Sequence, residues 1–410
     1  MKQAAEAPVG LTRRSLFRAL AGASGVFAAE TGTPASSPRE DNIYTRVLGV
    51  RPLLSVRGHT TIIGGCRMPA EVLRAMAEAN DYFVDMVELN AAAGRRIAEV
   101  MKAEAALVTA GSFSAMILGA AACLTGTDRS RVDALPHPTW AKRECLTQKA
   151  HRFDYDRAYR AAGMTMVDVE TKEQLINAIC ERTAMLAVLA SVERNARPGV
   201  LLPEEFVEIG RKAAVPVLID AASELPPESV LTRYTTMGAD LVVVSGGKGL
   251  EGPQSTGILA GRKDLIEAAS LNHSPNTAIG RGMKVGKEEI VGVITALNRY
   301  LRLNHEVVQE GWNKRARYLA EQLQGISGLN AEYRINVYGF GEIRISWDRA
   351  KIPLTGKQAA ERLKNGQPRI VYYDDDEGGV LQTRTMVEGE EILAARRLRQ
   401  FFRDEAPLRA

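Results

Sequence analysis

The sequence predicts an α/β protein whose large, mainly parallel sheet is followed by a smaller α+β domain. Short apolar runs at 185–191, 215–222 and 239–247 are bounded by turn residues and separated by helical patterns. Apolar runs without polar alternation are typical of parallel strands that helices cover on both faces. After residue 286 the pattern changes to a long helical stretch, then strands, then helices, which favours a second domain with α+β layers.

The chain has 410 residues, 45% of them hydrophobic, which suits one large domain with a smaller one attached. Residues 1–40 differ from the rest, because Arg13 and Arg14 precede an Ala/Gly-rich stretch and a Pro/Ser-rich tail. This layout indicates a twin-arginine signal peptide and a linker, with cleavage between Ala28 and Ala35. The Leu16-Phe17 order reverses the usual one. We expect export to the periplasm, with a basic leader on a cytoplasmic protein as the alternative.

The large domain is expected at 41–285, including the N-terminal segment before its first strand. The pattern at 203–214 predicts one of the helices that join its strands. The C-terminal part, 286–410, is expected to begin with a long linking helix at 287–326. The elements expected after it are three strands and two helices, at 331–339, 342–348, 369–374, 355–366 and 388–405.

Several classes of site and partner are disfavoured by composition. Cys66, Cys123, Cys145 and Cys180 form no CxxC pair, and the acidic run 374–377 is followed by Gly378 where a calcium loop needs Asp or Asn. We therefore expect a hairpin turn there and no metal site. The net charge is +4, and residues 1–40 supply +2 of it, so nucleic-acid binding is not expected. No apolar run approaches the roughly 18 residues of a membrane span.

Three chemically useful features follow predicted strands. Asp220 ends the run at 215–222, Lys248 follows the run at 239–247, and a Gly/Ser turn at 109–115 precedes an apolar helix. Strand ends of a parallel sheet meet at one edge, and a helix N-terminus with small residues suits a phosphate. The lysine is not part of a nucleotide-binding P-loop, because Val242 and Gly249 stand where Gly and Ser or Thr are required.

A phosphate cradle, a strand-end carboxylate and an accessible lysine together suit pyridoxal 5'-phosphate. The lysine forms a Schiff base with the aldehyde, and the acid keeps the pyridine nitrogen protonated so that the ring accepts electrons. Asp220 and Lys248 are 28 positions apart, about one helix and one strand, so they can stand at adjoining strand ends. The glycines beside the lysine are interpreted as turn residues that also leave space for the flat ring.

The segments "VPVLIDAASELPP", "GADLVVVSGGKGLEGPQSTGILAGRKDLIEAA" and "AIGRGMKVGKEEIVGVITAL" resemble the fold-type I pyridoxal-phosphate enzymes of the selenocysteine-synthase branch. That branch includes L-seryl-tRNA(Sec) selenium transferase and the D-glucosaminate-6-phosphate ammonia-lyases. The segment "LGVRPLLSVRGHTTIIGGCRMPAEVLRAMAEANDYFVDMVELN" resembles the lyases in particular. The resemblance covers about 41–400. It implies a seven-stranded, mainly parallel sheet and a homodimer or larger homo-oligomer with shared active sites, which the segment 280–289 is expected to reach.

The resemblance also implies roles for individual residues. Lys248 is the Schiff-base lysine, and Asp220 is the partner of the pyridine nitrogen. His151 is expected to stack on the ring, with Phe153 as the alternative. The expected phosphate contacts are Gly111, Ser112, Phe113, Ser114 and Ser245. An arginine is favoured for a substrate carboxylate because its fork matches two oxygens, and the candidates are Arg384 and Arg57.

The expected enzyme is a lyase that acts on a small amino acid or amino-sugar acid by α-proton abstraction and β-elimination, which releases a keto acid and ammonia. The alternative is a transferase of the L-seryl-tRNA(Sec) selenium transferase type. Little positive charge follows residue 40, and the N-terminal extension looks like an export signal. Both features favour a small-molecule lyase. A cofactor-binding protein without activity is disfavoured because Lys248 and Asp220 are both present.

Overall fold

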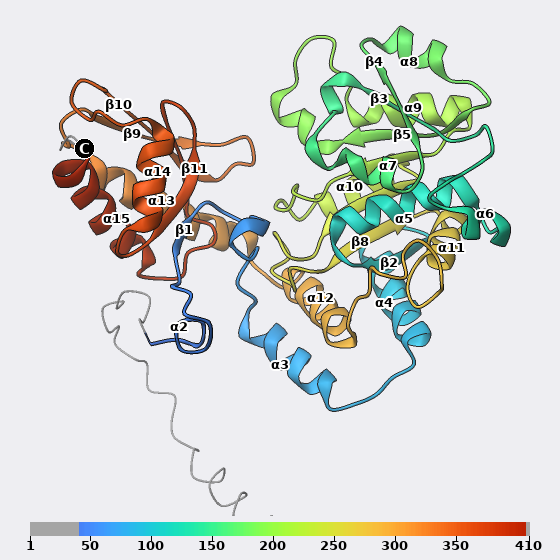
Figure 1. The fold of residues 1–410 in the computed structure, drawn as a ribbon, viewed down its shortest axis with the longest axis horizontal. Helices are drawn as coiled ribbons and strands as arrows, with labels where there is room; N and C mark the ends of the chain where they lie inside the picture. The colour runs from blue at the N-terminus through green and yellow to red at the C-terminus, as the bar shows by residue number, and fades with distance from the viewer. Residues whose placement is uncertain (1–40, 407–410) are drawn as a thin grey trace, which may run out of the picture.

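The structure is a computed structural model that describes residues 41–406, so the predicted signal peptide and linker at 1–40 lie outside the described residues. Figure 1 shows two bodies side by side, a larger one built on a long sheet and a smaller one that contains the C-terminal helices. Among residues 41–406, no helix combines the length and apolar character needed to cross a bilayer.

The large body is built on a seven-stranded sheet in the order β2-β8-β7-β6-β5-β3-β4. Parallel pairing links β7, β6, β5, β3 and β4, while β8 runs antiparallel to both of its neighbours, β2 and β7. The predicted fold class is thereby confirmed. The strands are β2 (Ala105–Thr109), β3 (Glu144–Gln148), β4 (Thr165–Val169), β5 (Thr183–Leu189), β6 (Val217–Asp220), β7 (Leu241–Ser245) and β8 (Gly257–Gly261).

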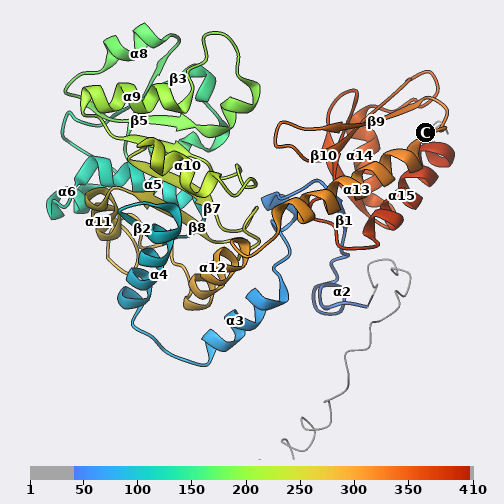
Figure 2. The same cartoon turned by 180° about the vertical axis from the view of Figure 1, so that it is seen from behind.

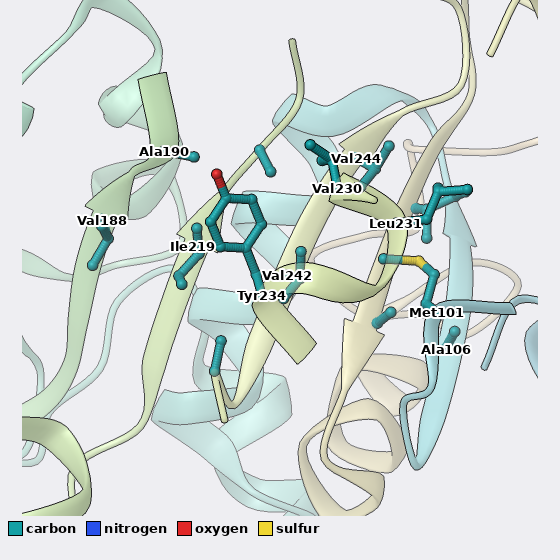
Figure 3. Packing of buried hydrophobic residues seen from close by; sticks show 14 of the residues in the cluster. Met101, Ala106, Val188, Ala190, Ile219, Val230, Leu231, Tyr234, Val242 and Val244 are labelled. Atoms are coloured by element: carbon teal, nitrogen blue, oxygen red, sulfur yellow. The ribbon is translucent and has the colours of Figure 1, made fainter. Parts of the chain in front are cut away.

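Helices cover both faces of this sheet, which explains why its strands have no polar side. In β7, Val242 and Val244 point into one buried cluster, and Leu241 and Val243 point into the other. Figure 3 shows the first cluster, where Tyr234 lies beside Ile219 and Val242. The covering helices are α4 (Met86–Met101), α5 (Gly111–Thr125), α6 (Arg129–Ala134), α7 (Arg157–Ala161), α8 (Lys172–Ala178), α9 (Pro203–Ala213), α10 (Val230–Met237) and α11 (Lys263–Asn272).

The smaller body has a five-stranded sheet in the order β1-β11-β12-β10-β9, with three helices packed against one another and the sheet. The acidic run forms the predicted hairpin turn, since antiparallel β11 and β12 flank it. The strand β12 was not predicted, because its two glycines weaken the strand pattern. The elements are β1 (Leu54–Val56), β9 (Leu329–Ile335), β10 (Gly341–Trp347), β11 (Ile370–Asp374), β12 (Gly378–Gln382), α13 (His305–Leu323), α14 (Gly356–Asn365) and α15 (Glu390–Gln400).

The N-terminal segment differs from the expected grouping with the large domain. Its strand β1 pairs in parallel with β11, from Leu54 opposite Ile370 to Val56 opposite Tyr372. Both views place β1 with the small body (Figure 1, Figure 2). Before it lies α2 (Ile43–Leu48), and after it α3 (Ala70–Asn80) packs against the large body. The first 40 described residues therefore cross from the small body to the large one.

The expected linking helix is two helices. The first, α12 (Lys287–Tyr300), packs against α3 and α4 of the large body, whereas α13 packs against β9, β10 and α15 of the small body. The chain breaks between them, and the Asn304 side chain caps α13 by accepting a hydrogen bond from the Val307 N–H at 3.1 Å. The junction between the bodies therefore lies inside the stretch that the sequence predicts as continuous helix.

Candidate active site

The carboxyl ends of six strands meet at one edge of the large sheet. Along this edge, the turn at Gly111 follows β2, Lys248 follows β7 and Asp220 ends β6, while β8 enters the sheet between β2 and β7. Neighbouring strands lie about 5 Å apart, so the turn and the lysine loop are separated by roughly 10 Å. The structure thus places the predicted cradle, lysine and acid along four adjacent strands.

The predicted phosphate cradle is the N-terminus of the buried helix α5. No side chain caps this end, and Gly111 has a φ of +79°, which favours glycine. A Cβ on Gly257 would lie 2.6 Å from the Ser112 nitrogen, so β8 also needs a glycine at this point. The Ser114 hydroxyl donates to the Ala110 carbonyl at 2.8 Å. The backbone N–H groups of the first turn and the Ser112 hydroxyl are therefore the donors this end offers an anion.

Lys248 lies in the turn that follows β7. Burial is the largest effect on its amine and lowers the pKa of Lys248, Asp220 raises that pKa, and Arg384 lowers it. Ser245, the last residue of β7, is buried and lies opposite Gly257 of β8. A lysine in this setting deprotonates more readily than an exposed one, as a nucleophile or base must.

The glycines around Lys248 lie in the turn after β7, as expected, and neighbouring backbone also requires them. A Cβ on Gly247 would lie 2.3 Å from the Gln254 Cα, and one on Gly249 would lie 2.5 Å from the Leu225 carbonyl oxygen. Their missing side chains are therefore required by contacts with the protein's own backbone. The lysine loop is packed tightly against the chain around it.

Asp220 is only 5% exposed at the end of β6. Its Oδ1 accepts a hydrogen bond from the Ala222 N–H at 3.0 Å. Burial raises the pKa of Asp220 to about 6, while the Ala222 bond and the charge of Lys248 act in the opposite direction. A cation brought against this carboxylate would favour its charged form, so Asp220 is suited to a protonated ring nitrogen.

His151 and Phe153 lie near the end of β3, beyond β6 and β5 along the same edge. The His151 Nε2 is 2.9 Å from the Leu201 carbonyl oxygen, and its Nδ1 accepts from the Leu189 N–H at 3.1 Å. Burial lowers the pKa of His151 to about 4, so the ring is neutral at pH 7. Phe153 packs against one face of the core. Ring stacking by either residue stays a prediction.

The two candidate arginines have different surroundings. Arg57 donates to the Tyr372 carbonyl at 2.9 Å and lies 3.8 Å from an Asp374 oxygen. Arg384 forms no salt bridge with any residue of 41–406, and its buried Nε, like that of Arg57, has no hydrogen-bond partner there. Its guanidinium lies over the Phe340 ring at 4.9 Å, and burial lowers the pKa of Arg384 to about 10. Arg384 is therefore the better anion receptor of the two.

Three residues of this region were not predicted. Glu224 is buried close enough for its charge to raise the pKa of Lys248, and Arg194 pairs with Glu224 through an Nε–Oε2 bond of 3.0 Å. His59 is 7% exposed, and the charges of Arg384 and Lys248 both lower its pKa, after the larger effect of burial. Arg194 follows the end of β5, so its place at a strand end could have been noticed. Nothing in the sequence links His59 to Lys248.

Comparison with known proteins gives the family. The aminotransferase class-V model matches residues 159–331. The chain is 35% identical to 5'-C-glycyluridine monooxygenase-decarboxylase of Streptomyces sp over 80% of this chain and 83% of that protein. It is 30% identical to D-glucosaminate-6-phosphate ammonia lyase of Salmonella typhimurium (strain 14028s / SGSC 2262) over 88% of this chain and 97% of that protein.

The chain belongs to the aminotransferase class-V family of fold-type I pyridoxal-phosphate enzymes. A solved structure of D-glucosaminate-6-phosphate ammonia-lyase matches 89% of this chain and 99% of that chain, with a TM-score of 0.77 and 29% identity. L-seryl-tRNA(Sec) selenium transferase of Moorella thermoacetica is more distant, at 24% identity over 84% of this chain and 81% of that protein. The resemblance to this family is confirmed.

The described residues fit the cofactor of this class-V family. The uncapped α5 N-terminus can hold its phosphate, Lys248 its aldehyde carbon, and Asp220 its ring nitrogen. Within the described part of the chain, no cluster of three or more His, Cys, Asp or Glu side chains could hold a metal ion.

Proposed function

We propose that this class-V enzyme is a pyridoxal-phosphate-dependent lyase that removes the α-proton of an amino acid or amino-sugar acid and expels a β-substituent. The products are a keto acid and ammonia. The observation that carries the proposal is the position of Lys248 and Asp220 at adjoining strand ends, where each charge shifts the pKa of the other. The charge of the buried Arg384 also reaches Lys248, and Arg384 has no ion-pair partner among residues 41–406. The ammonia-lyase relative at 30% identity supports it.

The bound cofactor would supply an electron sink for the charge that develops at the substrate's α-carbon. Asp220 would keep the ring nitrogen protonated, because a buried carboxylate gains most from an adjacent cation. Lys248 would hold the cofactor until substrate arrives, and its Nζ would then accept the α-proton. The buried environment that lowers the pKa of Lys248 increases the fraction of amine able to accept that proton.

Arg384 is proposed to bind the substrate carboxylate. A buried guanidinium without an acid loses solvation that an incoming carboxylate restores through two parallel hydrogen bonds. A carboxylate held in this way stays on the substrate while the α-proton leaves. This favours elimination over decarboxylation.

Decarboxylation is the second candidate, because the relative with 35% identity is named a monooxygenase-decarboxylase. The two candidates differ in their product, since decarboxylation releases CO₂ and the lyase releases ammonia with a keto acid. Selenium transfer to seryl-tRNA has weaker support, because those relatives are more distant and the charge after residue 40 is small.

The test is a screen of D- and L-amino acids and amino-sugar acids with cofactor-loaded protein, measuring keto acid, ammonia and CO₂. We expect keto acid and ammonia in equal amounts from wild type, and at least a 10³-fold lower rate from Lys248→Ala, because one residue serves both attachment and proton transfer. Borohydride reduction followed by mass spectrometry should place the cofactor on the peptide that contains Lys248. Equal product from both proteins would exclude the role of Lys248.

We also propose that the protein works as a homodimer or larger homo-oligomer. Lys287, in the segment expected to reach a neighbouring subunit, donates to the Ala79 carbonyl at 2.8 Å. This contact is at the end of α3, directly before an exposed apolar run in which Phe83 is 101% exposed. The exposed members of the run are Tyr82, Phe83, Val84 and Val87. A second copy of the chain is the proposed cover.

Export by the twin-arginine route remains a proposal. It is supported by Arg13 and Arg14 and by the Ala/Gly-rich stretch after them. A reporter fused to residues 1–40 should reach the periplasm, and replacing both arginines with lysine should keep it in the cytoplasm. Equal export of both fusions would contradict the proposed route.

A further inference from the structure

His59 is fixed between the lysine loop and the end of β12. On one side, the backbone of Arg57 bridges to Gln382. On the other side, the Gln254 Nε2 donates to the Thr61 carbonyl at 3.3 Å. The Cys66 thiol also donates to the Gly252 carbonyl at 3.4 Å. The segment that carries His59 therefore connects the small body to the loop that carries Lys248.

The packing on each side of His59 is close. A Cβ on Gly58 would lie 3.0 Å from the Arg384 Nε, and one on Gly65 would lie 2.9 Å from the Gly247 carbonyl oxygen. Both glycines have positive φ values, +70° and +78°, so other residues would strain the segment. The two ends of the His59 segment are thus held against Arg384 and against the lysine loop.

His59 lines a cavity and is close to Lys248. It lines a cavity of about 310 Å³ together with Arg384 and Trp312. Lys248 does not line this cavity, yet its charge reaches the His59 ring. If Arg384 holds the substrate carboxylate, the rest of the substrate extends into the same cavity. The substrate's β-substituent would then lie near the imidazole, which is also close to Lys248.

The proposed elimination needs a proton where His59 lies. The α-proton arrives on Lys248 Nζ, and a departing β-hydroxide must gain a proton to leave as water. An imidazole can accept a proton at one ring nitrogen while it releases the proton on the other. After these transfers Lys248 is neutral again, the leaving group has gained a proton, and the histidine is neutral with its N–H on the other ring nitrogen. Proton exchange with solvent restores the first tautomer before the next turnover.

We propose that His59 relays the proton from Lys248 Nζ to the β-hydroxyl of the substrate, and so acts as the acid for the leaving group. This inference rests on the proposed lyase function. In this relay one ring nitrogen accepts the proton from Lys248. The other ring nitrogen donates its proton to the departing oxygen, and the carbon–oxygen bond breaks.

A relay must be neutral before the proton arrives. Burial, Arg384 and Lys248 all lower the pKa of His59. The other charged groups that line the cavity are paired, since Arg67 binds Glu390 at 2.6 Å, Arg315 lies 3.9 Å from Glu391, and Glu251 binds Arg299 at 2.9 Å. Burial raises the pKa of the Cys66 thiol to about 12, so that thiol stays neutral at physiological pH. No unpaired negative charge among the residues that line the cavity therefore stabilises the protonated form of His59.

The kinetic test separates α-proton removal from departure of the leaving group. The probes are D-glucosaminate and D- and L-serine, which lose hydroxide, and D- and L-β-chloroalanine, which lose chloride without an acid. His59→Gln should lower ammonia release from the hydroxyl compounds about 10²-fold or more. It should still exchange the α-hydrogen for deuterium in D₂O and should still turn over β-chloroalanine. His305→Gln, a change at the junction between α12 and α13, is the matched control.

A purely structural role for His59 predicts that exchange, chloride loss and hydroxide loss all fall together in His59→Gln, and that result would overturn the relay. Wild type that releases no ammonia from any probe would overturn the proposed lyase function, and the relay with it.

A second readout needs no cofactor or turnover. The chain has five histidines, so the ring signals of His59 can be identified by NMR as those missing from His59→Gln. We expect the ring to be neutral at about pH 6, below the ordinary histidine pKa of about 6.5. Lys248→Met should raise the pKa of His59, because it removes a nearby positive charge. A His59 pKa that does not respond to Lys248→Met would overturn the contact on which the relay depends.

Discussion

At the scale of single residues, burial sets the properties of the two groups on which the site depends. It raises the pKa of Asp220 to about 6 and lowers the pKa of Lys248, and each residue's charge partly reverses the effect on the other. Burial has the same kind of effect on Arg384, since it lowers the pKa of this guanidinium to about 10. Burying these charged groups costs free energy that a bound ligand of opposite charge can offset. The site is therefore arranged for ligands and not for the stability of the chain.

Asp220→Asn should therefore stabilise the cofactor-free protein at neutral pH while abolishing activity. An unfolded aspartate has a pKa of about 4, so the raised folded pKa means that stability is lost as pH rises from about 4 through about 6. Between about pH 5 and about pH 8, wild type should lose roughly 1–2 kcal/mol of unfolding free energy relative to the variant.

The measurement is urea unfolding of both cofactor-free proteins at the two pH values. Parallel pH dependence in wild type and Asp220→Asn would contradict the raised pKa of Asp220. The amide introduced by this substitution also bears no charge to hold a protonated ring nitrogen, so cofactor affinity should fall in the same variant. Fluorescence titration with the cofactor checks this second consequence.

At the scale of elements, the strands of the large sheet were predictable and the loops after them were not. Unbroken apolar runs reveal strands that are covered on both faces, as in β5 and β7. The lysine loop has a shape set by contacts far along the chain, including those of Gly65 with Gly247 and of Gly249 with Leu225. A glycine in the sequence shows that a turn is possible but not which backbone it must avoid.

Gly247→Ala should destabilise the protein and displace Lys248. The added Cβ would lie 2.3 Å from the Gln254 Cα, and neither backbone segment can move freely because β7 and β8 hold them. Overpacking of this kind costs about 1–3 kcal/mol, and cofactor affinity should fall with it. Gly282→Ala is the control for stability alone, because nothing in this chain lies within 4 Å of a Cβ there. Equal thermal stability of the two variants would show that the loop is looser than its contacts indicate.

At the scale of the whole molecule, the site depends on how the two bodies meet. Arg194, after β5, pairs with Glu224 and lies with its guanidinium 3.5 Å from the centre of the Tyr338 ring. Tyr338 stacks on Phe340, and the guanidinium of Arg384 lies over Phe340. This chain of cation and aromatic contacts joins the large sheet to the proposed carboxylate receptor. Movement of one body relative to the other would therefore move Arg384 relative to Lys248.

The exposed run at 82–87 gives a prediction about assembly. Phe83→Asp should shift the protein toward monomer, because a charge in a covered apolar patch must be desolvated without a partner. Sedimentation velocity measures the change. Ile176→Asp, on α8 of the same body, exchanges a half-exposed apolar side chain in the same way and should leave assembly unaltered. An identical oligomer for wild type and Phe83→Asp would place the subunit interface elsewhere.

The sequence by itself determined the fold class and the family, and it predicted the lysine and its acid, because each depends on a local signal: apolar periodicity, strand ends and short motifs. Only the tertiary structure decided the setting of the remaining groups. It distinguishes the two candidate arginines: Arg384 has no acidic partner among residues 41–406, whereas Arg57 lies beside Asp374. It brings His59 to the lysine loop through β1, a strand whose partner β11 lies more than 300 positions away. Such contacts depend on packing between distant segments, and no local pattern of residues records them.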